Sequence, residues 1–163
     1  MNLSENQYKI EYEQVIDKYS DMVYRITVTI TGNVEDAKDA FQETFLRLVR
    51  NQEKIKDEEH LKAWLIRVAS NCAKTIVTNP WNKRTQGLEE DDEQVTYMEE
   101  EDTLLTEVKN LSPNYALSLY LFYYEEYSIK EIAEIMNKNE NTVKTLLSRG
   151  RMELKKRLEK GGQ

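Results

Sequence analysis

Negative charge in this chain is concentrated in one uninterrupted block. Residues 85–107 include ten acidic side chains and no basic one. A proline and a glycine lie at or near the start of the block and few apolar residues interrupt it, so the segment cannot bury enough surface to fold by itself. We therefore predict an acidic flexible linker at residues 80–103, which separates a folded part at residues 1–79 from another at residues 104–163.

Helix is the secondary structure that the composition favours outside this block. The chain has 163 residues with only five glycines and two prolines, and 33% of its residues are charged. Long helices are easier to build from such a composition than turn-rich sheets. We expect an all-α fold of two small helical domains.

Three helices are predicted in the N-terminal part, because apolar residues recur there at three- and four-residue steps. The first ends at Thr31-Gly32-Asn33, and its apolar stripe comprises Tyr12, Val15, Ile16, Tyr19, Met22, Val23 and Ile26. The second spans Val34 to Arg50, and its inward residues are Val34, Ala37, Phe41, Phe45 and Leu48. The third spans Glu59 to Val77, and its inward residues are Leu61, Trp64, Leu65, Val68, Cys72 and Ile76. We expect Trp64 to pack in the core rather than to offer a stacking surface.

Four helices are predicted in the C-terminal part. They cover Leu104 to Asn110, Ser112 to Glu126, Ser128 to Asn137 and Asn139 to Lys160. Ser112 followed by Pro113 is typical of a helix start, because proline suits the first helical position. Ser128 with Glu131 three residues later matches a capping box.

The last two predicted helices have the layout of a helix-turn-helix. This motif needs a small residue at the crossing, a turn residue that tolerates left-handed geometry, and apolar residues that face back; Ala133, Asn137, Val143 and Leu146 fall at those spacings. The residues left facing outward are Glu140, Asn141, Lys144, Thr145, Ser148, Arg149 and Arg151. Such groups contact phosphates and base edges in a major groove. The alternative is a helical hairpin whose basic face is only solvated.

Basic charge flanks the acidic block, although the net charge is −7. Residues 60–84 contain five bases and no acid, and residues 138–160 contain eight bases and three acids. Two basic segments of this kind favour a nucleic-acid partner, which the average charge alone would argue against.

Catalytic and metal chemistry has no candidate residues here. Cys72 is the only cysteine and His60 the only histidine, so the chain alone cannot assemble a disulfide or a Cys/His zinc site. We expect no enzymatic activity, no metal and no cofactor. No apolar run approaches the roughly 20 residues of a membrane span, and the N-terminus lacks the layout of a signal peptide, so we expect a cytoplasmic protein.

Three motifs follow one another along the chain: NVEDAKDAFQETFLRLVR at 33–50, LKAWLIRVASN at 61–71, and SIKEIAEIM at 128–136 with TVKTLLSRGR at 142–151. Together they resemble the extracytoplasmic-function (ECF) sigma factors, the smallest bacterial members of the sigma-70 family. The resemblance implies that residues 1–79 are sigma region 2, which binds core RNA polymerase and the promoter −10 element. It implies that residues 104–163 are sigma region 4, which reads the −35 element.

The resemblance also assigns residues to each task. The polymerase-binding set is Asp36, Asp39, Gln42, Glu43, Leu46 and Arg47. The −10 set is Arg67, Asn71, Lys74, Thr75 and Thr78, in which Asn71 lies nearest an unstacked base. The −35 set is Glu140, Asn141, Thr142, Lys144, Thr145, Ser148, Arg149 and Arg151. Taken alone, the outward face of residues 34–50 fits an ordinary solvated surface as well as a docking surface. Gly150 stands where family members often carry alanine, and predicts a weaker helix interior.

The partners implied are core RNA polymerase, promoter DNA and an anti-sigma protein, which could hold the chain at the membrane. The linker is expected either to thread through the polymerase or to act as a solubilising tether. Two other functions remain open: a helix-turn-helix regulator that binds an operator without polymerase, and a helical module that binds only protein. The motif at 33–50 argues against the first, and the motif at 142–151 argues against the second.

Overall fold

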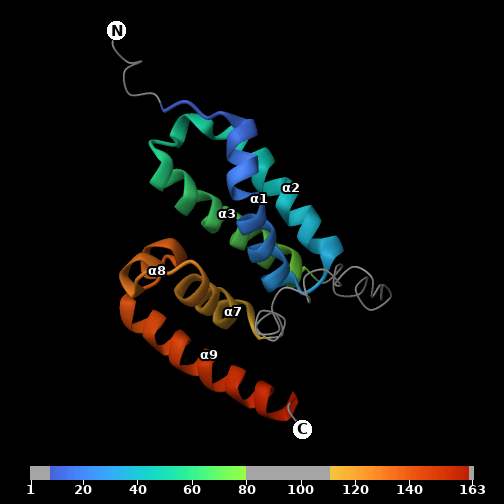
Figure 1. Ribbon diagram of the computed structural model, residues 1–163, viewed down its shortest axis with the longest axis vertical. Coiled ribbons are helices and arrows are strands. Elements are labelled where there is room, and N and C mark those ends of the chain that lie inside the picture. The colour runs from blue at the N-terminus through green and yellow to red at the C-terminus, as the bar shows by residue number, and fades with distance from the viewer. Residues whose placement is uncertain (1–7, 80–110, 162–163) are drawn as a thin grey trace.

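The computed structural model describes residues 8–79 and 111–161, and every regular element in these two ranges is helical (Figure 1). This confirms the predicted all-α class. The linker predicted at 80–103 and the helix predicted at 104–110 lie outside the described residues. Within the two described ranges, no helix combines the length and the apolar character that crossing a membrane requires.

The N-terminal half contains α1 (Tyr12–Thr31), α2 (Val34–Arg50) and α3 (Glu58–Thr78), with a 3-10 turn, η2 (Gln52–Lys54), before α3. Their bounds lie within one residue of the predicted bounds where a prediction was made. Gly32 ends α1 at φ +78°, a left-handed conformation that glycine adopts without strain. The side chain of Asn33 then accepts the Asp36 backbone N–H at 2.8 Å and begins α2. Asp57 caps α3 in the same way, by accepting the backbone N–H of His60.

The core of this half lies between the three helices, and Ile26, Leu48 and Leu65 are fully buried in it. The predicted stripe of α1 is wrong at Ile16, which is 43% exposed. Val15 and Tyr19, four residues apart, already fill the inner face at that level, and Ile16 is turned about 100° away from Val15. Phe41, Phe45, Val68 and Ile76 are half-buried against the core. Trp64 is half-buried there too, which confirms its predicted packing role.

The helix predicted over residues 112–126 is interrupted. It starts as α7 (Pro113–Leu119) with Pro113 at its first turn, but the Ser112 side chain makes no capping hydrogen bond. From Tyr120 the backbone widens into a π-helical turn, η4 (Tyr120–Tyr124), and Glu126 adopts a positive φ of 59°. The Tyr120 hydroxyl donates to Glu125 Oε2 at 2.7 Å, which holds the side chain that follows this turn.

The helix-turn-helix is formed by α8 (Ile129–Met136) and α9 (Glu140–Gly161). Ser128 and Glu131 make both hydrogen bonds of the predicted capping box, and Asn137 takes the predicted left-handed conformation at φ 60°. Ala133 and Val143 are buried as expected.

One inward residue of α9 was predicted at the wrong position. Leu147 is buried at 2% exposure, whereas Leu146 is only half-buried. Both three- and four-residue steps from Val143 keep a side chain near the same face of a helix. The four-residue step reaches Leu147, and Gly150, three residues further on, lies buried against α7.

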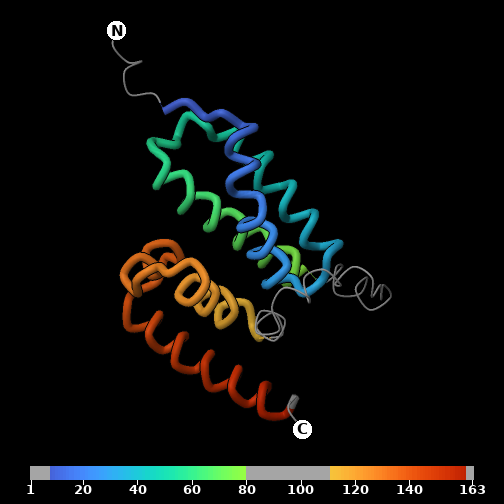
Figure 2. The backbone as a smooth tube through the Cα atoms, in the orientation of Figure 1, coloured from blue at the N-terminus to red at the C-terminus, as the bar shows by residue number. Residues whose placement is uncertain are grey.

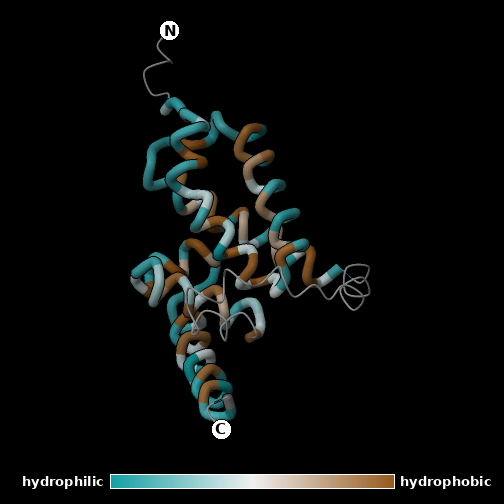
Figure 3. Tube along the Cα trace, turned by 45° about the vertical axis from the view of Figure 1, so that its right-hand side comes forward, coloured by the Kyte–Doolittle hydropathy of each residue, from teal (hydrophilic) through white to brown (hydrophobic). Residues whose placement is uncertain are grey.

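The two halves pack against each other (Figures 1 and 2). Helix α7 lies between the N-terminal half and α9, and contacts both α1 and α9, while α8 contacts α3. Each helix carries both hydrophobic and hydrophilic residues along its length, as expected of amphipathic helices (Figure 3). Buried side chains from both halves form one continuous core cluster.

Candidate nucleic-acid interface

The outward face of α9 carries most of the residues predicted to read DNA. Exposed side chains are Glu140, Asn141, Lys144, Thr145, Ser148, Arg149 and Arg151, and Thr142 is half-buried. Asn139 Oδ1 accepts the Thr142 backbone N–H at 2.8 Å, so Asn139 caps the start of this helix. The cap fixes the first turn, from which a recognition helix contacts base edges.

Arg151 is held by a residue that the sequence analysis did not single out. Its Nη1 donates to the Tyr123 hydroxyl at 3.1 Å, across from α9 to η4. The Tyr123 side chain is 56% exposed. No spacing rule links positions 123 and 151, because the contact depends on how η4 packs beside α9.

The outward face of α2 combines paired charges with exposed apolar area. Glu43 accepts a hydrogen bond from Arg47 at 2.9 Å and lies 3.6 Å from Arg50; the bond from Arg47 lowers the pKa of Glu43. Leu46 is 51% exposed, and Val49, which was not predicted, is 49% exposed. Exposed apolar side chains beside charged ones are the composition of a protein-docking surface.

The other predicted residues of α2 differ in their exposure and in their hydrogen bonds. Asp39 and Gln42 are exposed. Asp36 is half-buried at the start of the helix, and its Oδ2 accepts a hydrogen bond from the Asn33 side-chain amide at 3.1 Å. The structure therefore gives Asp36 a local role in holding the α1–α2 turn.

The face of α3 predicted to bind the −10 element is turned toward the C-terminal half. Arg67 Nε donates to the Ile135 carbonyl and its Nη2 to the Glu134 carbonyl, both at 3.2 Å. Asn71 is exposed and Lys74 is half-buried; burial, and then the nearby charge of Lys138, lower the pKa of Lys74.

Two predicted residues of α3 bond to their own helix. The hydroxyl of Thr75 donates to the Asn71 carbonyl at 2.9 Å. The hydroxyl of Thr78 donates to the Lys74 carbonyl at 3.0 Å. Both side chains are exposed, so a rotation about χ1 would free either hydroxyl for a backbone phosphate.

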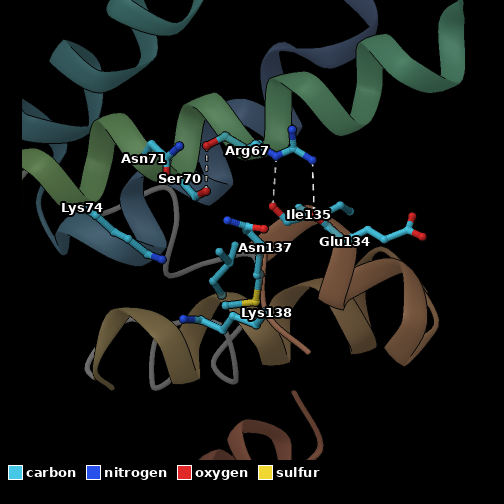
Figure 4. Close-up of a pocket in the computed structure, with 10 residues that line it drawn as sticks. Arg67, Ser70, Asn71, Lys74, Glu134, Ile135, Asn137 and Lys138 are labelled. Atoms are coloured by element: carbon cyan, nitrogen blue, oxygen red, sulfur yellow. Dashed lines mark hydrogen bonds between the residues drawn. The ribbon is translucent and has the colours of Figure 1, made fainter. Parts of the chain in front are cut away.

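A cleft of about 580 Å³ lies where α3 faces the turn between α8 and α9 (Figure 4). Arg67, Asn71 and Lys74 line it from α3, and Asn137 and Lys138 line it from the turn. The structure thus brings three of the predicted −10 residues together with two residues of the helix-turn-helix that were not predicted as site residues. None of the predicted residues on α2 or α9 lines this cleft.

Potential metal ligands and the single thiol were located among the described residues. These residues contain no group of three His, Cys, Asp or Glu side chains that could hold a metal ion. Cys72 is buried, and its burial raises the pKa of the thiol, which keeps it in the neutral, unreactive form.

Two family sequence models match the chain in the order that the motifs predict. Sigma-70 region 2 matches residues 15–80, and sigma-70 region 4 matches residues 101–154. The chain is 28% identical to the ECF RNA polymerase sigma factor SigW of Bacillus subtilis, over 90% of this chain and 88% of that protein. It is also 28% identical to the ECF RNA polymerase sigma factor SigM of Bacillus subtilis, over 88% of this chain and 92% of that protein.

A solved structure shows the same fold. The sigma factor RpoE from Bartonella quintana, crystallised with the anti-sigma factor NepR, aligns with a TM-score of 0.67 at 17% identity. The alignment covers 91% of this chain and 96% of that one, so both helical halves have counterparts in it.

Proposed function

Because the chain belongs to the ECF group of the sigma-70 family, we propose that it binds core RNA polymerase and directs transcription initiation at promoters that carry particular −10 and −35 elements. The observation that carries the proposal is the presence of regions 2 and 4 in order on one chain, the second built as a capped helix-turn-helix. A helix-turn-helix alone would serve an operator-binding regulator equally well, but such a regulator has no reason to carry the polymerase-binding motif of region 2.

The proposed −35 interface is the outward face of α9. Its first turns present Asn141 and Lys144, and the next turns present Ser148 and Arg149. Asparagine pairs well with adenine edges, and lysine and arginine bind guanine edges or phosphates. Arg151, held by Tyr123, is assigned to the DNA backbone, because a residue this far along the helix lies beyond the base-reading turns.

The proposed −10 interface is the face of α3 that carries Arg67, Asn71 and Lys74. One amide and two cations along successive turns suit a displaced strand, whose phosphates the cations bind while the amide reads an unstacked base. Thr75 and Thr78 extend this face toward the end of the helix.

The proposed polymerase contact is the outward face of α2. Leu46 supplies exposed apolar area at its centre, and Asp39, Gln42 and Arg47 supply polar groups around it. Val49 enlarges the apolar part and is added to the predicted set. An anti-sigma protein is a further proposed partner, since the structural relative RpoE was crystallised with one.

Transcription in vitro tests the proposal. Core RNA polymerase is assayed on a promoter library with and without the protein, and the products identify the promoters used. Asp39→Arg is expected to abolish initiation by losing polymerase, and Arg149→Glu by losing the −35 element. Glu35→Arg and Lys156→Glu are the matched controls, because they make the same charge changes at exposed positions of the same helices outside the proposed sets.

The results of this assay distinguish a sigma factor from an operator-binding regulator. Initiation that depends on Asp39 and Arg149, but not on the control positions, supports the sigma factor. A protein that binds specific duplex DNA yet never engages core polymerase would instead be an operator-binding regulator, and the face of α2 would be ordinary solvated surface.

A further inference from the structure

Three cations line the cleft between α3 and the turn that joins α8 to α9 (Figure 4). Arg67 and Lys74 reach it from α3, and Lys138 reaches it from the turn. Glu134 is the one acidic residue among the lining residues, and its carboxylate points away from Lys74 and Lys138. The cleft is therefore positively charged, in a chain whose net charge is −7.

Lys74 and Lys138 form no ion pair with an acidic residue of the part of the chain that the structure describes. Both side chains are half-buried, and Figure 4 shows their amino groups on the same side of the cleft. Burial lowers the pKa of Lys74, and the nearby charge of Lys138 lowers it further. Two like charges held together away from water cost free energy, which an anion between them would offset.

The end of α8 does not oppose an anion in this cleft. The last carbonyls of a helix carry its partial negative charge, which by itself repels anions. The Arg67 guanidinium donates to two of these carbonyls, those of Glu134 and Ile135, at 3.2 Å each. Arg67 therefore neutralises the helix end, and the two lysines remain available to bind the anion.

The rest of the cleft suits an organic group. Its volume of about 580 Å³ falls within the range of about 300–1,000 Å³ that is typical of pockets for small organic ligands. Buried Leu117 and half-buried Met136 supply an apolar wall, and a methionine side chain adapts to the shape of its neighbour. The exposed amides of Asn71 and Asn137 can donate and accept hydrogen bonds.

We propose that this cleft binds a nucleoside diphosphate, with its phosphates between Lys74 and Lys138 and its base against Met136. Binding of the nucleotide goes beyond the function proposed above and does not depend on it. Asn71 and Lys74 also belong to the proposed −10 set, so a bound nucleotide withholds them from a DNA strand. That consequence rests on the proposed function.

Calorimetric titration of the full-length protein tests the site. The probes are ADP and GDP, with inorganic pyrophosphate and adenosine as their charged and apolar parts, all without divalent cations. At least one nucleotide is expected to bind once per chain and about ten-fold more tightly than either part, because only a nucleotide fills both regions of the cleft. Failure of both nucleotides to bind, or pyrophosphate that binds as tightly as they do, overturns the proposal.

Lys138→Gln removes one of the two lysines without touching any residue assigned to DNA or polymerase. Nucleotide affinity is expected to fall about ten-fold, because a hydrogen bond from a charged donor to phosphate is lost. Lys138→Arg keeps the charge and should keep the affinity. Lys130→Gln, which removes an exposed charge from α8 outside the cleft, is the control. Equal affinities of Lys138→Gln and Lys130→Gln would contradict the assignment.

Thermal melts distinguish a ligand site from a structural role for Lys138. Without nucleotide, Lys138→Gln is expected to melt no lower than the wild type, because the substitution removes the repulsion from Lys74. Saturating nucleotide should raise the Tm of the wild type more than that of the variant. A variant that melts well below the wild type before nucleotide is added would make Lys138 structural. If Lys138→Gln does not fold, Lys74→Gln repeats the test from the opposite wall.

Competition with a fluorescein-labelled single-stranded DNA of mixed sequence separates this site from the proposed function. The nucleotide is expected to displace the strand, because both use Asn71 and Lys74. A nucleotide that binds without displacing the strand leaves the cleft site standing and removes these two residues from the −10 interface. A chain that binds nucleotide but supports no transcription with core polymerase contradicts the proposed function alone.

Discussion

The Tyr19 hydroxyl donates a hydrogen bond of 2.6 Å to Glu58 Oε2, which ties the middle of α1 to the first turn of α3. The Tyr8 hydroxyl donates to the other oxygen at 3.1 Å, and Lys18 Nζ lies 2.8 Å from Oε2. Bonds from Lys18, Tyr19 and Tyr8 lower the pKa of Glu58 to about 2. One carboxylate therefore joins the segment before α1, α1 itself and α3.

Glu58→Gln should lower stability at neutral pH and should matter less in acid. The folded-state pKa is depressed, so the carboxylate stabilises the fold above the unfolded pKa of about 4.3, and this contribution is lost as pH falls toward 2. Because the side chain is 50% exposed, we expect only about 1 kcal/mol, or a few degrees in Tm.

Thermal melts of the wild type and Glu58→Gln from pH 7 to pH 2.5 would check this. Glu59→Gln removes the same charge from the same first turn and is the control. A gap between Glu58→Gln and wild type that stays constant across the whole pH range would contradict the role given to the ionised carboxylate.

Gly150→Ala should destabilise the C-terminal half, although alanine is the better helix former. A Cβ at Gly150 would lie 3.2 Å from Leu119 Cδ1 and 3.4 Å from Tyr115 Cβ. Leu119 is 3% exposed and has little room to move. The strain of overpacking, about 1–3 kcal/mol, exceeds the gain in helix propensity, about 1 kcal/mol.

Chemical denaturation of Gly150→Ala and of Ser148→Ala would separate these effects. Ser148 is exposed on the same helix, so its replacement reports propensity alone. The prediction fails if Gly150→Ala is as stable as wild type or more so. The sequence alone indicates that Gly150 weakens the interior of α9. The structure shows that Gly150 lies where α9 and α7 approach closely.

The helices were predictable because their signals are local. The Gly32 stop, the Ser128–Glu131 box and the left-handed Asn137 each act within four residues, and all three occur as predicted. The errors arise where the burial of a side chain depends on how other helices pack against its own helix. Leu146 and Leu147 both satisfy helical spacing, and only the position of the packing helices selects Leu147.

The sequence predicts which helix faces of the candidate site point outward, but it does not predict how these faces lie relative to one another in the folded chain. Motifs predicted the outward faces of α2, α3 and α9, and all of those side chains are exposed or half-buried. The bonds from Arg67 to α8 end on backbone carbonyls, which no side-chain pattern encodes. The π-helical turn that brings Glu125 toward Lys62 likewise has no local signal of the kind that marks a cap.

Leu46→Ala should weaken binding to core polymerase while leaving the fold intact. The Leu46 side chain is 51% exposed, so its removal opens no cavity in the chain itself. An apolar residue at the centre of a docking surface contributes about 1–2 kcal/mol, or about ten-fold in Kd. Leu158→Ala removes a similarly exposed leucine from α9 and is the control.

Competition with a reference sigma factor for core polymerase would give the affinities, and thermal melts would verify the folds. Equal competition by Leu46→Ala and Leu158→Ala would remove the face of α2 from the proposed interface. Val49→Ala should behave as Leu46→Ala does, because the two side chains lie three residues apart on one helix face.

Asn141→Ala and Arg149→Ala should alter −35 binding in different ways, because an amide reads bases and a guanidinium also neutralises phosphate. Both residues are exposed on α9. Asn141→Ala is expected to change the preferred sequence at about one base pair, with the salt dependence unaltered. Arg149→Ala is expected to weaken binding to all duplexes and to reduce the slope of log K against log salt by about 1.

Titration of a randomised duplex library with each variant at several salt concentrations would distinguish the two. Lys156→Ala, which also removes one exposed charge from α9, is the control for long-range electrostatics. A slope change for Arg149→Ala no larger than that for Lys156→Ala would mean that Arg149 touches no phosphate. An unchanged sequence preference for Asn141→Ala would move base reading away from the first turn of α9, because Asn139 holds that turn in place whether or not Asn141 is present.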